Sequence, residues 1–154
     1  MMFRSAQLED VKAISRLLSQ LTRDHIALDF EKRARELLLE QIDPGSIAEY
    51  LKDGYDYQVA ESDGRIVGVV ATRDDNHLVH LYVADDWQGQ GLSRRLWELA
   101  RDRCLERSRT SRFTVNSSLN AIPVYERFGF LRTGPTRYED GIPMHPMAID
   151  LPRA

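Results

Sequence analysis

The apolar residues near the start of the chain recur at the spacing of a helix. A short apolar segment at residues 2–5 suits a strand, and from Gln7 the apolar positions fall three or four residues apart. The apolar stripe consists of Val11, Ile14, Leu17, Leu18 and Leu21. This spacing predicts a first strand followed by an amphipathic helix.

The pattern loosens between residues 22 and 54, where two further helices are predicted. The first spans residues 31–41, with consecutive leucines at 37–39 toward the core, and it stops at Asp43-Pro44-Gly45. Ser46 has the side chain of a good N-cap and is expected to open the second, shorter helix.

Strand patterns follow. Residues 55–59 alternate between apolar and polar side chains, and Asp63-Gly64 is a strong hairpin turn signal before an apolar strand at residues 66–72. After a turn at residues 74–76, another strand is predicted at residues 77–83. The sequence therefore predicts three consecutive strands in the middle of the chain.

The second half alternates helices and strands. A helix is predicted from Leu92 to about residue 107, then a strand at 113–116 and a short helix with Asn120 as its N-cap and Gly129 as its left-handed C-cap. Pro123 fits the first turn of that helix. Two strands, 130–138 and 144–151, are expected on either side of a turn at Asp140-Gly141.

The order of these elements indicates the fold class. A strand, two helices, three strands, a helix, a strand, a helix and two strands suit an α/β sandwich with a mixed sheet rather than a doubly wound one. No linker or repeat interrupts the chain, so residues 1–154 are expected to form one domain.

Composition excludes several classes of protein. With 42% hydrophobic and 29% charged residues, the 154-residue chain is not of a disordered or low-complexity type. No apolar run approaches the roughly 18 residues that span a bilayer, and Arg4, Glu9 and Asp10 interrupt any signal-peptide region, so a cytoplasmic location is expected. The single Cys104 falls on a helical apolar stripe and is interpreted as core filler. A net charge of -3 argues against nonspecific nucleic-acid binding.

The segment with the clearest chemical meaning is residues 82–93, a strand that leads through a polar loop with two glycines into a helix. Small residues let the backbone approach a ligand, and unpaired N–H groups of a first helical turn attract anions. A nucleotide P-loop is excluded because no lysine follows Lys52, and a dinucleotide fingerprint is excluded because Arg94 replaces its third glycine. Arg94 and Arg95 oppose the helix dipole, which favours a phosphorylated ligand nearby over solvated surface charges.

At these residues the sequence resembles the GCN5-related N-acetyltransferases (GNAT family). That family's pattern Gln/Arg-x-x-Gly-x-Gly/Ala is matched by Gln88, Gly91 and, with serine in the last place, Ser93. The opening Arg4-Ser-Ala, the hairpin at 59–68, the strand at 81–83 and the Tyr-Glu-x-x-Gly-Phe segment at 125–130 are also similar, in the same order.

The resemblance implies an N-acetyltransferase that binds acetyl-CoA. The pyrophosphate would lie on the backbone of Gln88, Gly89, Gln90, Gly91, Leu92 and Ser93, beside Arg94, and the pantetheine arm along Leu81, Tyr82 and Val83. The Val83 N–H would donate to the acetyl carbonyl oxygen. Where many relatives have an asparagine seven residues before the tyrosine, this chain has Ser118, with Asn116 and Asn120 two residues to either side, and the alternatives stay open.

The resemblance also suggests catalytic residues. Tyr125 holds the position of the general acid. An ordinary tyrosine pKa near 10 lies above that of a thiol, which suits proton transfer between the phenol and the leaving thiolate. The alternative is that Tyr125 is a core residue packed on Phe128 and Phe130. His80 is the candidate base, with His77, Asp56 and Glu61 as substitutes, or solvent alone. His145 is interpreted as structural, and no histidine is spaced with cysteine or carboxylates as a metal site.

Residues 22–56 are expected to form the acceptor side. They hold nine acidic and five basic residues, a net -4, which leaves +1 for the remainder. The functional interpretation is attraction for a small cationic amine, and the alternative is a solvated surface. Rival functions are a noncatalytic acyl-CoA sensor and a protein or aminoacyl-tRNA acetyltransferase. The oligomeric state, including a homodimer, is left open.

Overall fold

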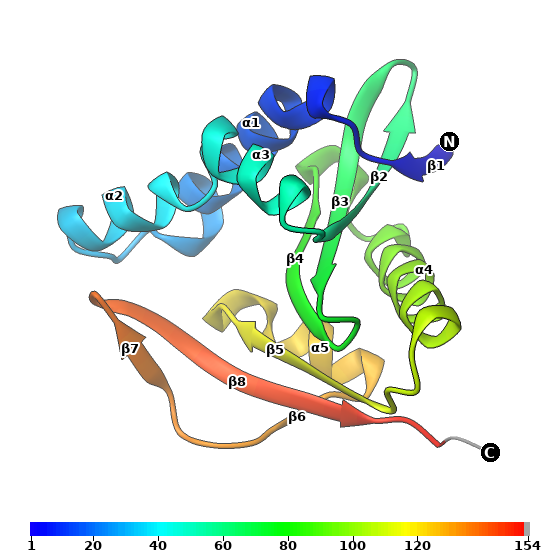
Figure 1. The fold of residues 1–154 in the computed structure, drawn as a ribbon. Helices are drawn as coiled ribbons and strands as arrows, with labels where there is room; N and C mark the ends of the chain where they lie inside the picture. The colour runs from blue at the N-terminus through cyan, green and yellow to red at the C-terminus, as the bar shows by residue number, and fades with distance from the viewer. Residues whose placement is uncertain (153–154) are drawn as a thin grey trace.

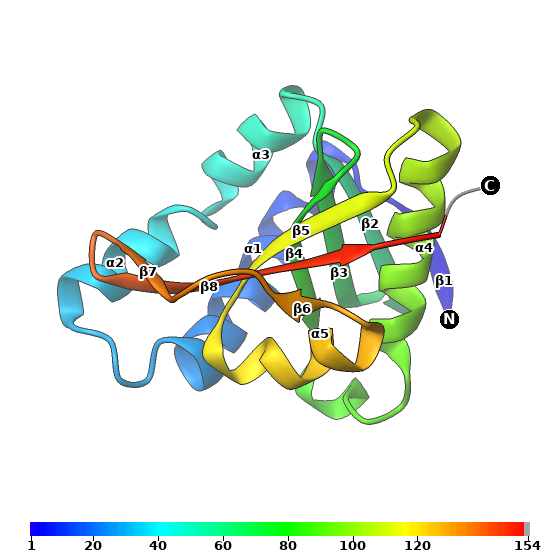
Figure 2. The same ribbon diagram turned by 90° about the horizontal axis from the view of Figure 1, so that it is seen from below.

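The computed structural model describes residues 1–152, which form one mixed sheet flanked by helices (Figures 1 and 2). The strand order is β1-β2-β3-β4-β5-β8-β6, with β7 paired to β8. Pairing is antiparallel except between β4 and β5. The strands are β1 (Met2–Ser5), β2 (Asp56–Ser62), β3 (Arg65–Arg73), β4 (His77–Val83), β5 (Arg112–Ser117), β6 (Leu131–Arg132), β7 (Arg137–Glu139) and β8 (Ile142–Asp150).

Five α-helices cover the two faces of this sheet. They are α1 (Val11–Leu21), α2 (Lys32–Glu40), α3 (Pro44–Lys52), α4 (Leu92–Arg107) and α5 (Ile122–Phe128). In Figure 1, α1 and α3 lie on the opposite side of β2, β3 and β4 from α4. The predicted mixed α/β fold is therefore confirmed.

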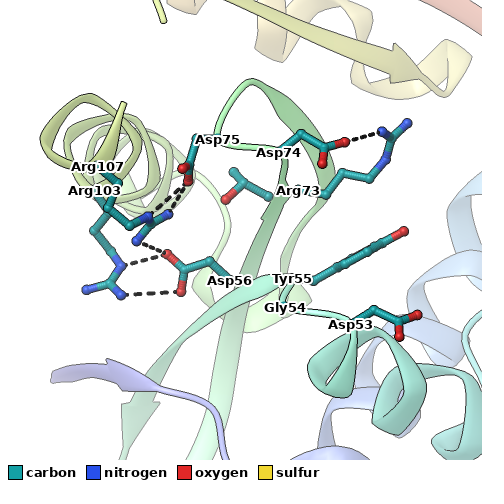
Figure 3. Close-up of a pocket in the computed structure, with 10 residues that line it drawn as sticks. Asp53, Gly54, Tyr55, Asp56, Arg73, Asp74, Asp75, Arg103 and Arg107 are labelled. Carbon is teal, nitrogen blue, oxygen red and sulfur yellow. Dashed lines mark hydrogen bonds and ion pairs between the residues drawn. The ribbon is translucent and has the colours of Figure 1, made fainter. Parts of the chain in front are cut away.

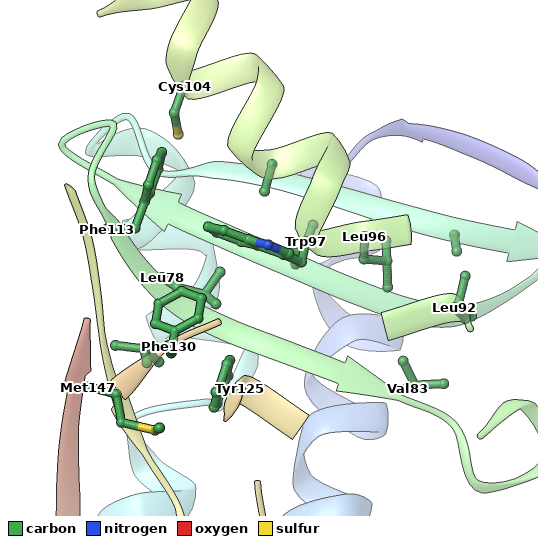
Figure 4. Close-up of a cluster of buried hydrophobic side chains, with 14 of the residues drawn as sticks. Leu78, Val83, Leu92, Leu96, Trp97, Cys104, Phe113, Tyr125, Phe130 and Met147 are labelled. Atoms are coloured by element: carbon green, nitrogen blue, oxygen red, sulfur yellow. The ribbon is translucent and has the colours of Figure 1, made fainter. Parts of the chain in front are cut away.

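Two buried clusters hold the layers together. Under α4, Trp97 packs edge-on against Phe113 and Phe130, with ring centroids 5.3 and 5.1 Å apart (Figure 4). The helix approaches β3 so closely that a Cβ at Gly68 would lie 2.8 Å from a Leu96 methyl carbon, so a larger residue there would require the Leu96 side chain to move. Cys104 is fully buried in the same cluster, as expected for core filler. The second cluster, under α1 and α3, includes Ile14, Leu18, Ile47, Tyr57 and Val59.

Three predicted element boundaries were wrong, each for a local reason. Asp43, not Ser46, caps α3: its carboxylate accepts a hydrogen bond from the Ser46 N–H at 2.8 Å. Asn120 does not cap α5 but lies in a 3-10 turn, Leu119–Ala121, that precedes it. The strand predicted at 130–138 is divided into β6 and β7 around Gly134-Pro135, because proline has no N–H to donate.

One prediction about the acceptor-side segment also differs from the structure, and one feature of that segment was not predicted. The leucines at 37–39 are only half-buried, and Ala34 is the buried residue of α2. Residues Thr22–Ile26 extend α1 as a π-helical turn, which hydrophobic spacing does not reveal.

Candidate active site

The sheet opens between β4 and β5. These parallel strands pair only at His77–Thr114 and Leu78–Val115. Just beyond, the β3–β4 register shifts so that Val79 is an extra residue, a β-bulge, and bulges bend the strand that carries them. Residues 79–83 of β4 consequently have one edge that β5 does not cover.

The polar groups on that edge belong to Leu81 and Val83. The Ala84 N–H donates to the Val67 carbonyl at 2.9 Å, so Ala84 and, two residues earlier, Tyr82 direct their backbone groups toward β3. Hydrogen-bonding direction alternates along an antiparallel strand, and Leu81 and Val83 therefore direct theirs toward the opening. The Gln88 side-chain amide donates to the Val83 carbonyl at 3.0 Å, which fixes the start of the loop.

The glycine loop presents backbone N–H groups at the mouth of this opening. Gly89 and Gly91 have φ values of +75° and +79°, a region that side chains rarely allow, and Gly91 directly precedes α4. The first helical bond is donated by the Arg95 N–H to the Gly91 carbonyl, at 3.2 Å. The N–H groups of Leu92, Ser93 and Arg94 are thus left for a ligand, with the helix dipole behind them.

A cleft of about 750 Å³ runs past the loop and along the open edge of β4. Nearly all predicted site residues line it; the exception is Gln90, whose side chain turns away and donates to the Asp86 carbonyl at 3.2 Å. The lining residues among those predicted are His80, Leu81, Tyr82, Val83, Gln88, Gly89, Gly91, Leu92, Ser93, Arg94, Asn116, Ser118, Asn120 and Tyr125.

The two arginines of the first helical turn have different surroundings. Arg94 lines the cleft, donates to the Arg127 carbonyl at 3.0 Å and lies over the Phe128 ring. Arg95 lies over the Phe3 ring, 4.6 Å from its centroid, and is absent from the cleft lining. Of these two arginines, Arg94 is therefore the one placed to serve a ligand in the cleft.

Tyr125 belongs to both the core and the cleft. Its ring packs edge-on against Phe128 and Phe130, with centroids 6.2 and 5.5 Å away. Figure 4 shows Tyr125 close to Phe130 in the buried cluster, and the residue is 6% exposed. Burial raises the pKa of its hydroxyl well above the usual value near 10. The hydroxyl therefore stays protonated at every working pH and can act as a donor.

His80 lies among tyrosines rather than carboxylates. Its ring is 5.9 Å from that of Tyr57 and 5.8 Å from that of Tyr82, centroid to centroid. Its Nε2 is buried with no hydrogen-bond partner, and burial lowers the pKa of the imidazole to about 4. These surroundings make His80 a neutral and weak base.

The substitute bases are already engaged. His77 bonds through Nδ1 to the Thr114 hydroxyl at 2.7 Å, and burial lowers its pKa to about 4 as well. Asp56 accepts from Arg103, Glu61 accepts from Arg4, and neither carboxylate lines the cleft. His145 hydrogen-bonds the Thr136 hydroxyl at 2.9 Å, in keeping with a structural role.

The three polar candidates after β5 lie together. Asn116, Ser118 and Asn120 all line the cleft, and the Ser118 hydroxyl donates to the Asn120 side-chain oxygen at 2.7 Å. That bond engages the side-chain oxygen of Asn120. It also leaves the Asn120 amide N–H groups as donors toward the cleft.

Of the two interpretations of the acidic residues in 22–56, the structure supports the solvated surface and not the attraction for a cationic amine in the cleft. Residues 22–56 do contribute to the cleft, but among the described residues no aspartate or glutamate lines it. The acidic side chains serve elsewhere: Asp43 caps α3, Glu36 and Glu49 pair with neighbouring Arg33 and Lys52, and Asp56 faces α4 at the far side of the sheet (Figure 3). The segment supplies apolar and aromatic residues instead.

Several residues that line the cleft were not predicted from the sequence. Ile26, Phe30, Leu38, Ile42 and Tyr50 line the acceptor side. A further contact joins that side to the glycine loop, because His25 Nε2 lies 2.7 Å from an Asp85 carboxylate oxygen. The available signal was a set of apolar residues without a regular period in residues 22–56, which the charge count obscured.

Two classes of feature are missing from the part of the chain that the structure describes. Residues 1–152 hold no group of three or more histidine, cysteine or acidic side chains arranged for a metal ion. Within the same residues, no helix has the length and apolar character needed to cross a bilayer.

The fold and site define an α/β domain of the acyltransferase class, with an anion cradle beside an opening in a mixed sheet. The chain belongs to the GNAT family, because the model of the acetyltransferase (GNAT) domain matches residues 18–151. The resemblance stated from the sequence is thereby confirmed. No curated protein matches the chain.

Solved structures share this fold at low identity. A GCN5-related N-acetyltransferase from Rhodopseudomonas palustris is 19% identical, with a TM-score of 0.81 over 97% of this chain and 95% of that one. The PaiA N-acetyltransferase from Thermoplasma acidophilum, solved with coenzyme A, is 12% identical (TM-score 0.78; 97% and 98% covered). YncA from Salmonella typhimurium, solved with acetyl-CoA, is 18% identical (TM-score 0.67; 100% and 95% covered).

Proposed function

We propose that this protein transfers the acetyl group of acetyl-CoA directly to a primary amine. The observation that carries the proposal is the single cleft that the glycine loop, the open edge of β4 and Tyr125 line together. Two proteins of the same fold were solved with coenzyme A or acetyl-CoA. The cleft offers groups suited to the pyrophosphate, the pantetheine arm and the acetyl thioester of that molecule.

The binding groups are mostly backbone. The N–H groups of residues 89–94 would hold the pyrophosphate, as the N-terminus of a helix does for phosphates in general. The free edge groups of Leu81 would pair with the amides of the pantetheine arm, as an added strand does, and the Val83 N–H remains for the acetyl group. On the β5 side, Asn116, Ser118 and Asn120 supply polar contacts.

The chemistry requires few side chains. The amine nitrogen forms a bond to the acetyl carbonyl carbon, the C–S bond breaks, and the sulfur leaves with the electron pair. The Val83 N–H is the donor for the carbonyl oxygen as it gains charge. The Tyr125 hydroxyl gives a proton to the sulfur and regains one from solvent, which takes the proton released by the nitrogen.

We assign deprotonation of the amine to solvent rather than to His80. A base whose conjugate acid has a pKa of about 4 is poorly matched to an alkylammonium, and the His80 Nε2 is inaccessible in this structure. The neutral imidazole then serves to shape the apolar wall beside β4.

A pair of glycine variants tests the cradle. Gly91→Glu should abolish binding of CoA measured by calorimetry, because it strains a φ of +79° and places a carboxylate against phosphate. Gly64→Glu is the matched control, since Gly64 has a φ of +77° in a hairpin turn outside the cleft. Wild-type protein should bind acetyl-CoA and CoA but bind NAD and ATP poorly. Unaltered CoA affinity in Gly91→Glu would contradict the proposal.

A further inference from the structure

The part of the cleft beyond the open edge of β4 has an apolar lining from six separate segments of the chain. We call it the acceptor arm and define it by Ile26, Phe30, Leu38, Ile42, Tyr50 and Met144. These residues come from the π-helical turn, the segment before α2, α2 itself, the α2–α3 connection, α3 and β8. The arm therefore exists only in the folded protein.

The wall of the acceptor arm is held in place before any ligand binds. The Tyr50 ring stacks on Tyr55 with centroids 4.9 Å apart, and its hydroxyl donates to the Gln41 carbonyl at 2.9 Å. The Ile42 carbonyl accepts from the buried Ser15 hydroxyl at 2.7 Å. On the other side, a Cβ at Gly141 in the β7–β8 turn would lie 3.4 Å from the Ala34 Cβ of α2, so hairpin and helix are in contact.

Among the described residues, no negatively charged side chain lines the arm; the nearby Asp85 carboxylate lies outside the lining and is already paired with His25 Nε2 at 2.7 Å. Two further histidines beside the arm, His77 and His80, are neutral because burial lowers the pKa of each to about 4. Arg73 lines the cleft near His77 and is paired with Asp74 at 2.9 Å. Within residues 1–152, no carboxylate lines the cleft.

A second ammonium group on an acceptor would be unfavourable in these surroundings. It would lose water on entering an apolar arm and would find no carboxylate, and burial of an unpaired charge is costly. An apolar or aromatic body would instead exchange water for Phe30, Leu38 and Tyr50. The reacting nitrogen itself must be uncharged when it attacks the thioester, because an ammonium has no free electron pair.

We infer that the acceptor is a monoamine with an apolar or aromatic body, rather than a polyamine or an aminoglycoside. This inference rests on the proposed function for the direction in which the cleft is used. It replaces the cationic acceptor that the charge of residues 22–56 suggested.

The test compares 2-phenylethylamine with spermidine and kanamycin, first by calorimetric binding to CoA-saturated protein and then as acceptors in thiol release from acetyl-CoA. We expect 2-phenylethylamine to bind at least about tenfold more tightly and to be acetylated with the higher kcat/KM. Tighter binding or faster acetylation of spermidine or kanamycin would overturn the inference. Selective binding of 2-phenylethylamine without any thiol release would uphold the inference and contradict the proposed function.

A variant pair locates the site. Leu38→Asp removes apolar contact from the phenyl ring and offers a carboxylate to a second ammonium, so it should reduce the preference for 2-phenylethylamine over spermidine about tenfold or more while CoA affinity is unchanged. Leu28→Asp is the control, because Leu28 is 65% exposed and outside the cleft lining. Equal effects of the two variants would overturn the assignment of the site. If Leu38→Asp does not fold, the comparison of the three amines with wild-type protein tests the inference by itself.

Discussion

Tyr125 illustrates how one residue can satisfy the core and the reaction together. The packing of its ring on Phe128 and Phe130 fixes the position of the hydroxyl at the cleft. The same burial raises the pKa of the phenol, which makes it a weaker acid in isolation. A thiolate that forms in the same surroundings loses hydration as well, so its basicity rises with that of the phenolate.

The first prediction tests this residue. Tyr125→Phe keeps the packed ring and removes only the proton donor, so kcat should fall by about 10² to 10⁴ with little change in the affinity for acetyl-CoA. Tyr138→Phe is the control, because Tyr138 is 70% exposed and lies outside the cleft lining. Steady-state thiol release measures both variants. Activity of Tyr125→Phe within twofold of wild type would leave Tyr125 with its packing role alone.

The second prediction concerns pH. With a pKa of about 4, His80 is neutral throughout the range from pH 6 to 9, and protonation would remove it as a base only near pH 4. The fall of kcat/KM below neutral pH should therefore follow the ionisation of the amine and be the same in His80→Gln. Rate profiles for two amines of different pKa measure this. An acidic limb with a midpoint between pH 6 and 7 that vanishes in His80→Gln would show that the imidazole is the base.

At the scale of elements, the cap at the N-terminus of α3 stabilises a helix that carries Tyr50 of the acceptor arm. The Asp43 carboxylate satisfies the Ser46 N–H, and Pro44 occupies the first turn. Asp43→Ala should lower the free energy of unfolding by about 1 kcal/mol, whereas Asp43→Asn, which retains a capping oxygen, should change it much less. Urea unfolding measures the two. Equal losses would show that the charge rather than the hydrogen bond stabilises this helix.

Elements with a regular pattern were predictable from the sequence, and elements shaped by tertiary contacts were not. The stripe of α4 and the apolar run of β3 carry their period in consecutive residues. The π-helical turn at Thr22–Ile26 and the bulge at Val79 have no such local signal. Asn120 has the right chemistry for a cap but uses its side-chain oxygen for Ser118.

The same distinction separates the two ends of the cleft. The anion cradle at the cofactor end lies within one continuous segment, residues 82–93, so its chemistry could be inferred from adjacent residues. The acceptor arm is assembled from elements more than 100 residues apart, between Ile26 and Met144. A charge sum over residues 22–56 does not say which side chains face inward, and the inward-facing ones proved apolar.

At the scale of the whole molecule, the opening of the sheet leaves few hydrogen bonds between β4 and β5, so other contacts must stabilise each part. One such contact is an ion-pair network on the far side of the sheet from α3, beside a cavity of about 490 Å³ (Figure 3). Arg103 and Arg107 of α4 reach Asp56 at 2.7 and 3.0 Å, and Arg107 reaches Asp75 of the β3–β4 turn at 2.7 Å. The network joins α4, β2 and that turn.

The last prediction follows from the ionisation of Asp56. Burial alone would raise the pKa of this carboxyl, but hydrogen bonds from Arg103 and Gln58 outweigh it and hold the pKa below its usual range. Because the folded-state pKa is the lower one, the contribution to stability is full above the ordinary aspartate pKa of about 3.9 and is lost as pH falls through the folded value.

Asp56→Asn should therefore lower the free energy of unfolding by about 1 to 2 kcal/mol at pH 7, and the difference from wild type should shrink below about pH 4. Asp74→Asn, at a position 71% exposed, should change stability by less than about 0.5 kcal/mol at either pH. Urea unfolding at pH 7 and pH 3 distinguishes these cases. A loss in Asp56→Asn that is the same at both pH values would mean that packing of the side chain, and not its charge, stabilises this end of the sheet.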